Sequence, residues 1–515
     1  MTDPRTFSAK AVWAGYLAMI VGNFMAILDI QIVASSLREI GAGVSASADE
    51  IAWVQTSYLI AEVIAIPLSG LLGRALSMRT LFTVSALGFT LMSLACAFAW
   101  NIESLILFRT FQGFLGGGMI PTTMAALFIL FPQHKRSAPI VLVGMVSTLA
   151  PSIGPTIGGW LTESMGWEWL FLINLLPGLA CAAMVWRFSP LKDREPALLR
   201  RIDIIGLIGM ALFLGSLEFV LEEGPGHDWL ADDAVLTMAV LMAAGGGLFF
   251  WRAFTSASPI VDLRVFADRN FVLGCIVSMI AGVGLYGSVY LTPLFLGNVG
   301  GYNTLEIGYT MIVTGVAMFF TAPIVGNLQS RVDLRLLLAA GLVMTAAGMW
   351  LNSLLTAEAG FWELAAPQAL RGSGLMMCMI PMTGLALGTM RHDRVQNASA
   401  LFNLMRNLGG ALGLAMINSL MDRGQALHRV ELATAVSTGH ADVAAWLAGN
   451  EAVMAARGIA DPAAAALARL AQMVEREATV MAFNDIFLTL AVAFALLLPL
   501  ILFTRPAAAA APDGH

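Results

Sequence analysis

The sequence predicts an all-α protein that crosses a membrane many times. Its 515 residues are 58% hydrophobic and 12% charged, and the mean hydropathy is +0.79, whereas a soluble chain is roughly a quarter charged. Apolar runs of about 20 residues, the length that spans a bilayer, recur from one end of the sequence to the other. The net charge of −6 and the pI of about 5.6 argue against nucleic acid as a partner.

Each apolar run is expected to form one spanning helix, and there are about fourteen such runs. The expected helices cover residues 12–36, 50–73, 79–99, 103–130, 138–162, 167–188, 202–221, 234–253, 271–297, 305–329, 334–355, 362–389, 395–420 and 483–503.

The positions of the basic residues predict the orientation. If the N-terminus is cytoplasmic, Lys and Arg gather in the inner loops, while the short outer loops carry mainly Asp and Glu. This is the positive-inside pattern. An odd number of helices would break the alternation of basic inner loops and acidic outer loops. Both termini are therefore expected to be cytoplasmic. The inner loops then contain Arg74 and Arg79, Lys135 and Arg136, residues 187–201, residues 252–269, Arg331 and Arg335, and Arg391 and Arg394.

Two halves of the sequence carry the same landmarks in the same order, at offsets of 256 residues (70 to 326) and 262 residues (109 to 371). The repeat predicts a six-helix bundle in residues 1–190, a second in 270–505, and two inserted helices in 200–255. Repeats with a binding site at their interface are a transporter architecture. The matched landmarks are Gly70–Arg74 with Gly326–Arg331, Arg109–Gly113 with Arg371–Gly374, and Gly154–Gly159 with Gly409–Gly413.

Residues 421–482 form a long connection that would lie on the outer, periplasmic side. They are rich in alanine and charge, and 462–482 has helical spacing. We expect an external helical element. A docking site for a partner and a plain solvated connector both remain open.

The expected fifth helix contains an unusual stretch, Ser147–Leu161, with two prolines and three glycines in an apolar run. Proline removes a backbone donor, and glycine lets another helix approach closely. Composition alone leaves two interpretations open, a kinked packing helix and a moving element.

Charged residues inside apolar spans are costly, so each is a functional hypothesis. Asp29 suits proton binding, although a static ion pair would also explain it. Arg109 could hold backbone carbonyls or modulate a carboxylate. Glu222 is a candidate second proton site, or is simply solvated near the outer end of its helix.

A second group of residues is expected to line a central substrate cavity. Glu62 shares a helix face with Gln55 and Tyr58, where substrate contact and structural hydrogen bonding are both consistent with the pattern. Soft and aromatic side chains suit a promiscuous apolar pocket. The expected cavity residues are Phe24, Met25, Gln55, Tyr58, Glu62, Tyr286, Tyr290, Asn403 and Arg406.

Catalysis and metal binding find no support in the sequence. The four cysteines match no metal-binding spacing. All six histidines fall in expected loops or the tail, so no intramembrane His cluster or Ser–His pair is visible. We therefore expect a protein that is not an enzyme and has no cofactor.

At several motifs the chain resembles the major facilitator superfamily and, within it, the fourteen-helix drug:proton antiporters of the EmrB/QacA type, EmrB in particular. The expected fifth helix matches their antiporter motif at Gly154, Pro155, Gly158 and Gly159. Further matches are LILFRTFQG around Arg109, LDIQIVASSL around Asp29, and later stretches such as LFNLMRNLGGALG.

The resemblance implies a major facilitator fold and export of hydrophobic drugs, driven by the proton gradient and by alternating access. For such an exchange we expect Asp29 to carry the proton and Arg109 to tune its release, with Glu222 as the candidate second carrier. We also expect the glycines of the fifth helix to let it bend and slide against its neighbour in the second bundle. The resemblance further implies a place in the cell inner membrane, among lipids, with a periplasmic EmrA-like adaptor and a TolC-like outer-membrane channel as partners. A facilitator or importer of the same fold and a lipid flippase are the alternatives.

One motif departs from the family pattern. In the loop after the expected second helix Gly70 is kept, but Arg74 stands where the family has an aspartate that locks the two bundles. We expect a gating role for this loop with a different locking partner.

Overall fold

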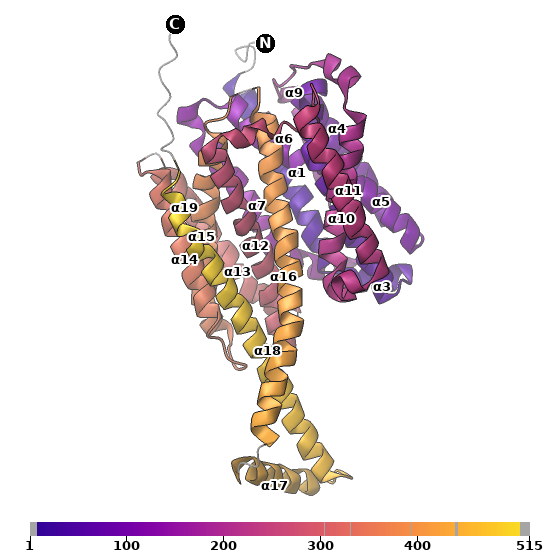
Figure 1. Ribbon diagram of the computed structural model, residues 1–515, viewed down its shortest axis with the longest axis vertical. Coiled ribbons are helices and arrows are strands. Elements are labelled where there is room, and N and C mark those ends of the chain that lie inside the picture. Colours follow the sequence, from indigo (N-terminus) through magenta and orange to yellow (C-terminus); the bar gives the residue numbers. More distant parts are fainter. Residues whose placement is uncertain (1–7, 303, 330, 392, 438–440, 505–515) are drawn as a thin grey trace.

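The computed structural model describes residues 8–504, except 303, 330, 392 and 438–440 (Figure 1). The described residues form helices and no strand, and fourteen helical segments are long and apolar enough to cross a membrane. The prediction of an all-α, fourteen-span protein is therefore confirmed. Both chain ends fall outside the described residues.

The first bundle contains six spans, and a short helix α2 (Leu37–Val44) follows the first of them. The fourth span breaks into two helices at Gly117 and Gly118, and the sixth breaks at Ile173 and Asn174. The six spans are α1 (Ala9–Ala34), α3 (Ala48–Leu76), α4 (Met78–Ala97), α5 (Ile102–Gly116) with α6 (Met119–Leu130), α7 (Ser137–Met165), and α8 (Trp169–Leu172) with α9 (Leu175–Phe188).

Two further spans precede the second bundle, and Asp203 caps the first of them by accepting a hydrogen bond from the backbone of Gly206. The inserted spans are α10 (Ile204–Glu223) and α11 (Asp233–Thr255). The second bundle contains α12 (Arg269–Asn298), α13 (Thr304–Leu328), α14 (Leu334–Asn352), α15 (Phe361–Leu387), α16 (Val395–Ser437), and α18 (Pro462–Leu496) with α19 (Leu498–Ile501).

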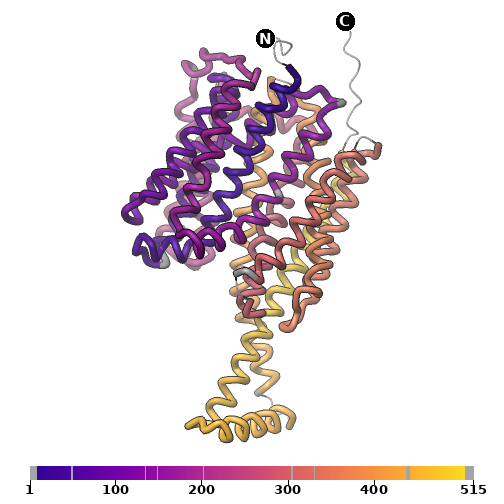
Figure 2. The backbone as a smooth tube through the Cα atoms, turned by 180° about the vertical axis from the view of Figure 1, so that it is seen from behind, coloured from indigo at the N-terminus to yellow at the C-terminus, as the bar shows by residue number. Residues whose placement is uncertain are grey.

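The two bundles lie side by side, and the same helix pairs pack within each (Figure 2). In the first bundle α3 packs on α5, α1 on α7 and α4 on α9. In the second, α13 packs on α15, α12 on α16 and α14 on α18. Between the bundles α7 meets α13 and α3 meets α16. The inserted helix α10 packs on both α3 and α16, so it lies along one of these two seams.

Helices α16 and α18 continue far beyond the expected ends at residues 420 and 483 and form a projecting arm, with α17 (Ala441–Ala456) at its tip (Figure 1). They extend because they pair with each other outside the bundle. Gln425 bonds Thr479, and His428 bonds Asp485 at 2.7 Å. The expected external helical element is therefore an extension of two spanning helices.

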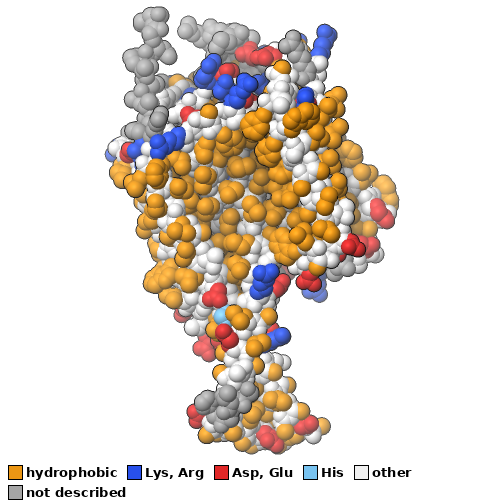
Figure 3. Space-filling model, in the orientation of Figure 1, with side chains coloured by type: hydrophobic (Ala, Val, Ile, Leu, Met, Phe, Trp, Pro, Cys, Tyr) orange, Lys and Arg blue, Asp and Glu red, His pale blue; other side chains and the backbone are white. Residues whose placement is uncertain are grey.

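The surface carries an apolar belt between two polar ends (Figure 3). In this view Lys and Arg side chains gather at the end where the described chain begins and finishes, whereas Asp and Glu dominate the opposite rim. Large apolar side chains within the belt are exposed, as expected for a surface that meets lipid tails. Leu176, for example, is 80% exposed.

Candidate functional site

A cavity of about 670 Å³ lies between the bundles, where α1, α3, α7, α10, α12, α13 and α16 meet. Its lining runs from the buried side chain of Glu62 to exposed residues such as Ser35 and Asn298. These exposed residues lie at the end from which the arm projects. The cavity therefore opens there, opposite the end that is rich in Lys and Arg.

Four carboxylates line this cavity, one from α3 and three from the inserted helix α10. Glu62 is 2% exposed and Glu218 is 5% exposed. Farther out are Glu222 and Glu223, and Glu223 accepts a hydrogen bond from Thr56 at 3.1 Å. The second bundle contributes neutral polar groups instead, namely Tyr286, Tyr290, Asn407 and Asn418. An apolar cavity with acidic groups on one side can hold an amphipathic cation.

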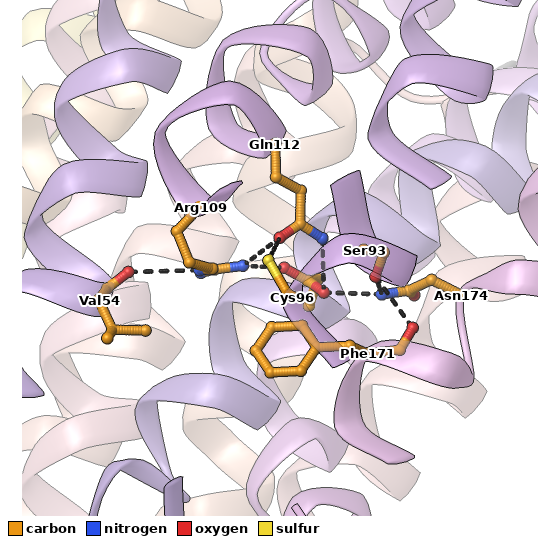
Figure 4. Close-up of polar contacts among 8 residues, drawn as sticks. Val54, Ser93, Cys96, Arg109, Gln112, Phe171 and Asn174 are labelled. Carbon is orange, nitrogen blue, oxygen red and sulfur yellow. Dashed lines mark hydrogen bonds and ion pairs between the residues drawn. The ribbon is translucent and has the colours of Figure 1, made fainter. Parts of the chain in front are cut away.

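The Asp29 carboxylate is not on the cavity lining and lies inside the first bundle. Figure 4 shows its partners Arg109, Gln112 and Asn174 directed toward one another. The carboxylate is fully buried and accepts hydrogen bonds from Arg109 Nη1 at 2.6 Å, Asn174 Nδ2 at 2.7 Å and Gln112 Nε2 at 3.3 Å. All three partners are donors, so the arrangement fits an ionised carboxylate.

Arg109 contacts both a backbone carbonyl and a carboxylate, the two kinds of partner that the sequence left open. Its Nε donates to the Val54 carbonyl at 3.3 Å, while its Nη1 pairs with Asp29 and also donates to Gln112 Oε1 at 2.9 Å. The guanidinium carbon lies 4.1 Å from the centre of the Tyr58 ring, a cation–π contact. The buried charge is therefore compensated on several sides.

A second buried arginine, Arg371 of α15, has neutral partners. Its Nη1 donates to Thr292 at 3.1 Å and its Nη2 to Thr314 at 3.0 Å and to Gln368. Among the described residues no carboxylate lies within ion-pair distance of this guanidinium. Sequence reasoning missed Thr292 and Thr314, although the repeat offset from Asp29 and Tyr58 points to them.

The structure places some of the expected cavity residues on the lining and others away from it. Gln55, Glu62, Tyr286 and Tyr290 line the cavity, as do Glu222 and Pro155. The expected residues that are not on the lining are Phe24, Met25, Tyr58, Asn403 and Arg406.

Helix rotation explains why Met25 of α1 is not on the cavity lining. Met25 and Asp29 are four residues apart and share a face that points into the first bundle, where Met25 packs near Gly178. Phe24 is seven residues from Gln31 and shares its face, but it lies two turns nearer the start of α1 and packs in an apolar cluster of the first bundle. The cavity takes the adjacent face of α1, with Gln31 and Ser35, because each residue turns the helix by about 100°.

The other three residues hold neighbouring groups in place. Tyr58 lies under the Arg109 guanidinium. Asn403 donates to the Ser399 carbonyl at 2.9 Å and accepts from Arg406 Nη2 at 2.8 Å. Sequence reasoning missed Gln31, Asn407 and Asn418, and polar residues within apolar spans were the signal that could have found them.

The glycines of the antiporter motif in α7 pack against α1. A Cβ on Gly154 would lie 2.5 Å from the Gln31 Cβ, and one on Gly158 would lie 2.9 Å from the Ile32 carbonyl oxygen. Gly159, next in the chain, is half-buried. The expected contact of these glycines with the second bundle is therefore wrong for Gly154 and Gly158, since they serve a close approach within the first bundle.

Neighbouring residues of α7 do meet the second bundle. Pro155 and Thr156 line the cavity, and a Cβ on Gly308 of α13 would lie 2.9 Å from the Thr156 hydroxyl oxygen. The repeat partner of the motif behaves alike, because a Cβ on Gly413 of α16 would lie 2.9 Å from the Val283 Cα of α12. Each bundle thus joins its first and fifth helices through glycines.

The end opposite the cavity mouth is closed by contacts between the bundles. Gln396 of α16 donates to the Ser69 carbonyl of α3 at 3.1 Å, and a Cβ on Gly70 would lie 3.2 Å from the Asn397 Cα. Arg74 turns back and donates to the Gly70 carbonyl of its own helix. In place of the aspartate of the family pattern, an amide and a glycine make the contact between α3 and α16, and Ser399 of α16 donates to the Pro121 carbonyl of α6 at 2.8 Å.

Comparison with known proteins agrees with this architecture. Residues 19–414 match the Major Facilitator Superfamily. The chain is 50% identical over 426 residues to the "Colistin resistance protein EmrB" of Acinetobacter baumannii, with 83% of each chain covered. It is 29% identical over 502 residues to the "Multidrug export protein EmrB" of Escherichia coli, covering 97% of this chain and 96% of that one.

A solved structure shows the same fold at low sequence identity. The proton:xylose symporter XylE, bound to 6-bromo-6-deoxy-D-glucose, superposes with a TM-score of 0.59 at 12% identity, covering 94% of this chain and 95% of that chain. The family match, the relatives and the paired bundles lead to one conclusion. The chain belongs to the major facilitator superfamily of membrane transporters.

Proposed function

We propose that this protein is a multidrug exporter that moves hydrophobic drugs out of the cell in exchange for protons. The observation that carries the proposal is the cavity, which is apolar, lined by four carboxylates, open at one end and closed at the other by contacts between the bundles. The names of the relatives, one for colistin resistance and one for multidrug export, support the same function.

The orientation in the membrane follows from the surface charge. The closed end of the cavity lies on the side where Lys and Arg gather, which is the cytoplasmic side under the positive-inside rule. The described conformation then faces outward. Rocking of the bundles about the α3–α16 and α7–α13 seams would open the cytoplasmic side, and Gly70 and Arg74 lie at the first of these seams.

We also place the protein in the cell inner membrane, with the arm of α16, α17 and α18 in the periplasm. The arm projects from the rim where the cavity opens, so an EmrA-like adaptor docked there would receive the drug as it leaves. A TolC-like channel would complete the route across the outer membrane.

Transport into everted membrane vesicles tests the function. An imposed pH gradient, acid inside, should drive accumulation of the lipophilic cation tetraphenylphosphonium above its equilibrium level, and collapse of the gradient should release it. Accumulation that only equilibrates would show a facilitator and contradict the proposal. Fluorescent phospholipid translocation without drug transport would favour a flippase.

Resistance measurements test the substrate and the partner. Cells that express the protein should tolerate more colistin and tetraphenylphosphonium than cells with an empty vector. Co-expression of an EmrA-like adaptor should raise this tolerance further. Equal tolerance with and without the adaptor would overturn the tripartite assembly but leave the export function standing.

A further inference from the structure

We propose that Glu62, and not Asp29, is the carboxylate whose proton is exchanged for the drug. This inference rests on the proposed function and names the residue that couples the two flows. Three observations carry it: the hydrogen bonds of Asp29, the open position of Glu62, and the groups that face Glu62.

The partners of Asp29 hold it in its ionised form. Oδ2 accepts from Arg109, and Oδ1 accepts from both Asn174 and Gln112. Each carboxylate oxygen has two lone pairs, so both sites of Oδ1 are taken, while a proton on Oδ2 would remove the charge that pairs with Arg109. The carboxylate is also fully buried away from the cavity. Removal of one partner from a buried ion pair is strongly unfavourable. Asp29 is therefore suited to a structural role. It joins α1 to α5 and to the start of α9, and it stays ionised while it does so.

Glu62 is in the opposite situation. It lines the cavity, is 2% exposed, and its Oε1 is buried with no hydrogen-bond partner among the described residues. Within the described part of the chain no Lys, Arg or His lies within ion-pair distance of it. A buried carboxylate without a partner is stable only when it carries a proton or meets a cation. The cavity beside it has space for a cationic drug.

The charged groups around Glu62 come from every side of the cavity. Arg406 of α16, Arg109 of α5 and Asp29 of α1 act on it electrostatically, as do Glu218 of α10 and Tyr286 of α12. Tyr58 lies one turn away on the same helix. Asp29 neutralises the charge of Arg109. Among the described residues, the cation without an acidic partner that acts most strongly on Glu62 is therefore Arg406, which belongs to the other bundle. The charge of Glu62 therefore acts across the α3–α16 seam.

If the drug and the proton compete for the Glu62 carboxylate, that competition alone is enough to exchange one for the other. A cationic drug that binds beside Glu62 displaces its proton to the side then open. A proton that enters from outside neutralises Glu62 and removes the attraction that holds the drug. Because the two cannot occupy the carboxylate together, each leaves as the other arrives.

Proton release on drug binding is the test. When tetraphenylphosphonium is added to the purified full-length protein in weakly buffered detergent solution, a pH-sensitive dye should report released protons. The affinity should rise by about tenfold per pH unit, the slope for one exchanged proton. Glu62→Gln should abolish the release and flatten the slope, while Glu62→Asp should keep both. Asp29→Asn, where it folds, should still release protons.

Glu103→Gln is the matched control, because Glu103 is an exposed acid in the first turn of α5, away from the cavity. It should behave like the unsubstituted protein. Should Glu62→Gln fail to fold, labelling of the unsubstituted protein replaces it: dicyclohexylcarbodiimide should modify Glu62, as located by mass spectrometry, and tetraphenylphosphonium should protect it. Modification of Asp29 with Glu62 untouched would overturn the inference.

The outcomes separate the two proposals. If the unsubstituted protein accumulates drug in response to a pH gradient and Glu62→Gln still does so, the Glu62 assignment fails while the exporter stands. If the unsubstituted protein neither releases protons nor responds to the gradient, proton coupling and the Glu62 assignment fail together.

Discussion

Arg109 and Arg371 are equivalent arginines in the two bundles, and their surroundings differ in charge. Both are fully buried, both lie on the fourth span of their bundle, and each bonds a glutamine three residues away. The partner of Arg109 on the first span is Asp29, whereas Arg371 has Thr292, at an offset of 263 residues.

The same replacement occurs at two further places. Tyr58, which stacks on Arg109, corresponds at an offset of 256 residues to Thr314, which bonds Arg371. At that offset Glu62 corresponds to Met318, an apolar residue that is 1% exposed. At the compared positions both bundles therefore have the arginine and its glutamine, while a carboxylate stands only in the first. The carboxylates that line the cavity likewise come from the first bundle and from α10.

Arg109→Met should have the largest effect. It leaves the Asp29 carboxylate buried without its cation, which costs about 3–5 kcal/mol. Thermal unfolding of the purified protein in detergent measures the loss. The double variant Arg109→Met with Asp29→Leu should recover part of it, because the orphaned charge is gone. A double variant as unstable as the single one would contradict the ion-pair account.

Arg371→Met should destabilise less. It removes hydrogen bonds from a charged donor to neutral acceptors, each worth about 1.5–3 kcal/mol. It strands no carboxylate, and the loss is partly offset because a buried charge without a counter-ion is removed with it. The same unfolding assay applies, and drug transport by the protein that folds should keep its dependence on the pH gradient. Loss of that dependence would show that the second arginine takes part in coupling, which would erase the difference between the bundles.

Gly113→Ala and Gly374→Ala should cost similar amounts, about 1–3 kcal/mol each. A Cβ on Gly113 would strike the Tyr58 carbonyl of α3, and one on Gly374 would lie 2.5 Å from the Thr345 backbone nitrogen of α14. Equal losses in unfolding temperature would show that helix packing is still symmetric where charge is not. If the unfolding temperature fell in only one of the two variants, the bundles would differ in helix packing as well as in charge.

Thr292→Asp should have the smallest effect, a change within about 1 kcal/mol. It would give Arg371 the carboxylate that Arg109 has, and for a buried pair the gain in attraction roughly offsets the cost of removing the charge from water. The reverse change, Asp29→Thr, should be as harmful as Arg109→Met. Comparison of the two variants in one unfolding experiment measures the asymmetry directly, and equal losses would refute it.

The sequence by itself determined the number of spans, the two-bundle plan and the residues that could carry chemistry. These follow from local properties: the length of apolar runs, the repeat spacing and the cost of polar groups in lipid. Glu62, Glu222, Asp29 and Arg109 were all found in this way. The lengths of α16 and α18 were not, because those helices extend by pairing with each other.

Only the tertiary structure decided which of these residues share a site. A turn of about 100° per residue separates Asp29, bound by donors inside the first bundle, from Gln31 on the cavity wall. The same rotation directs Gly154 and Gly158 toward α1. Sequence spacing states which residues share a helix face, but the packing of neighbouring helices decides what that face meets. For that reason Asp29 is enclosed and Glu62 stands open to the cavity.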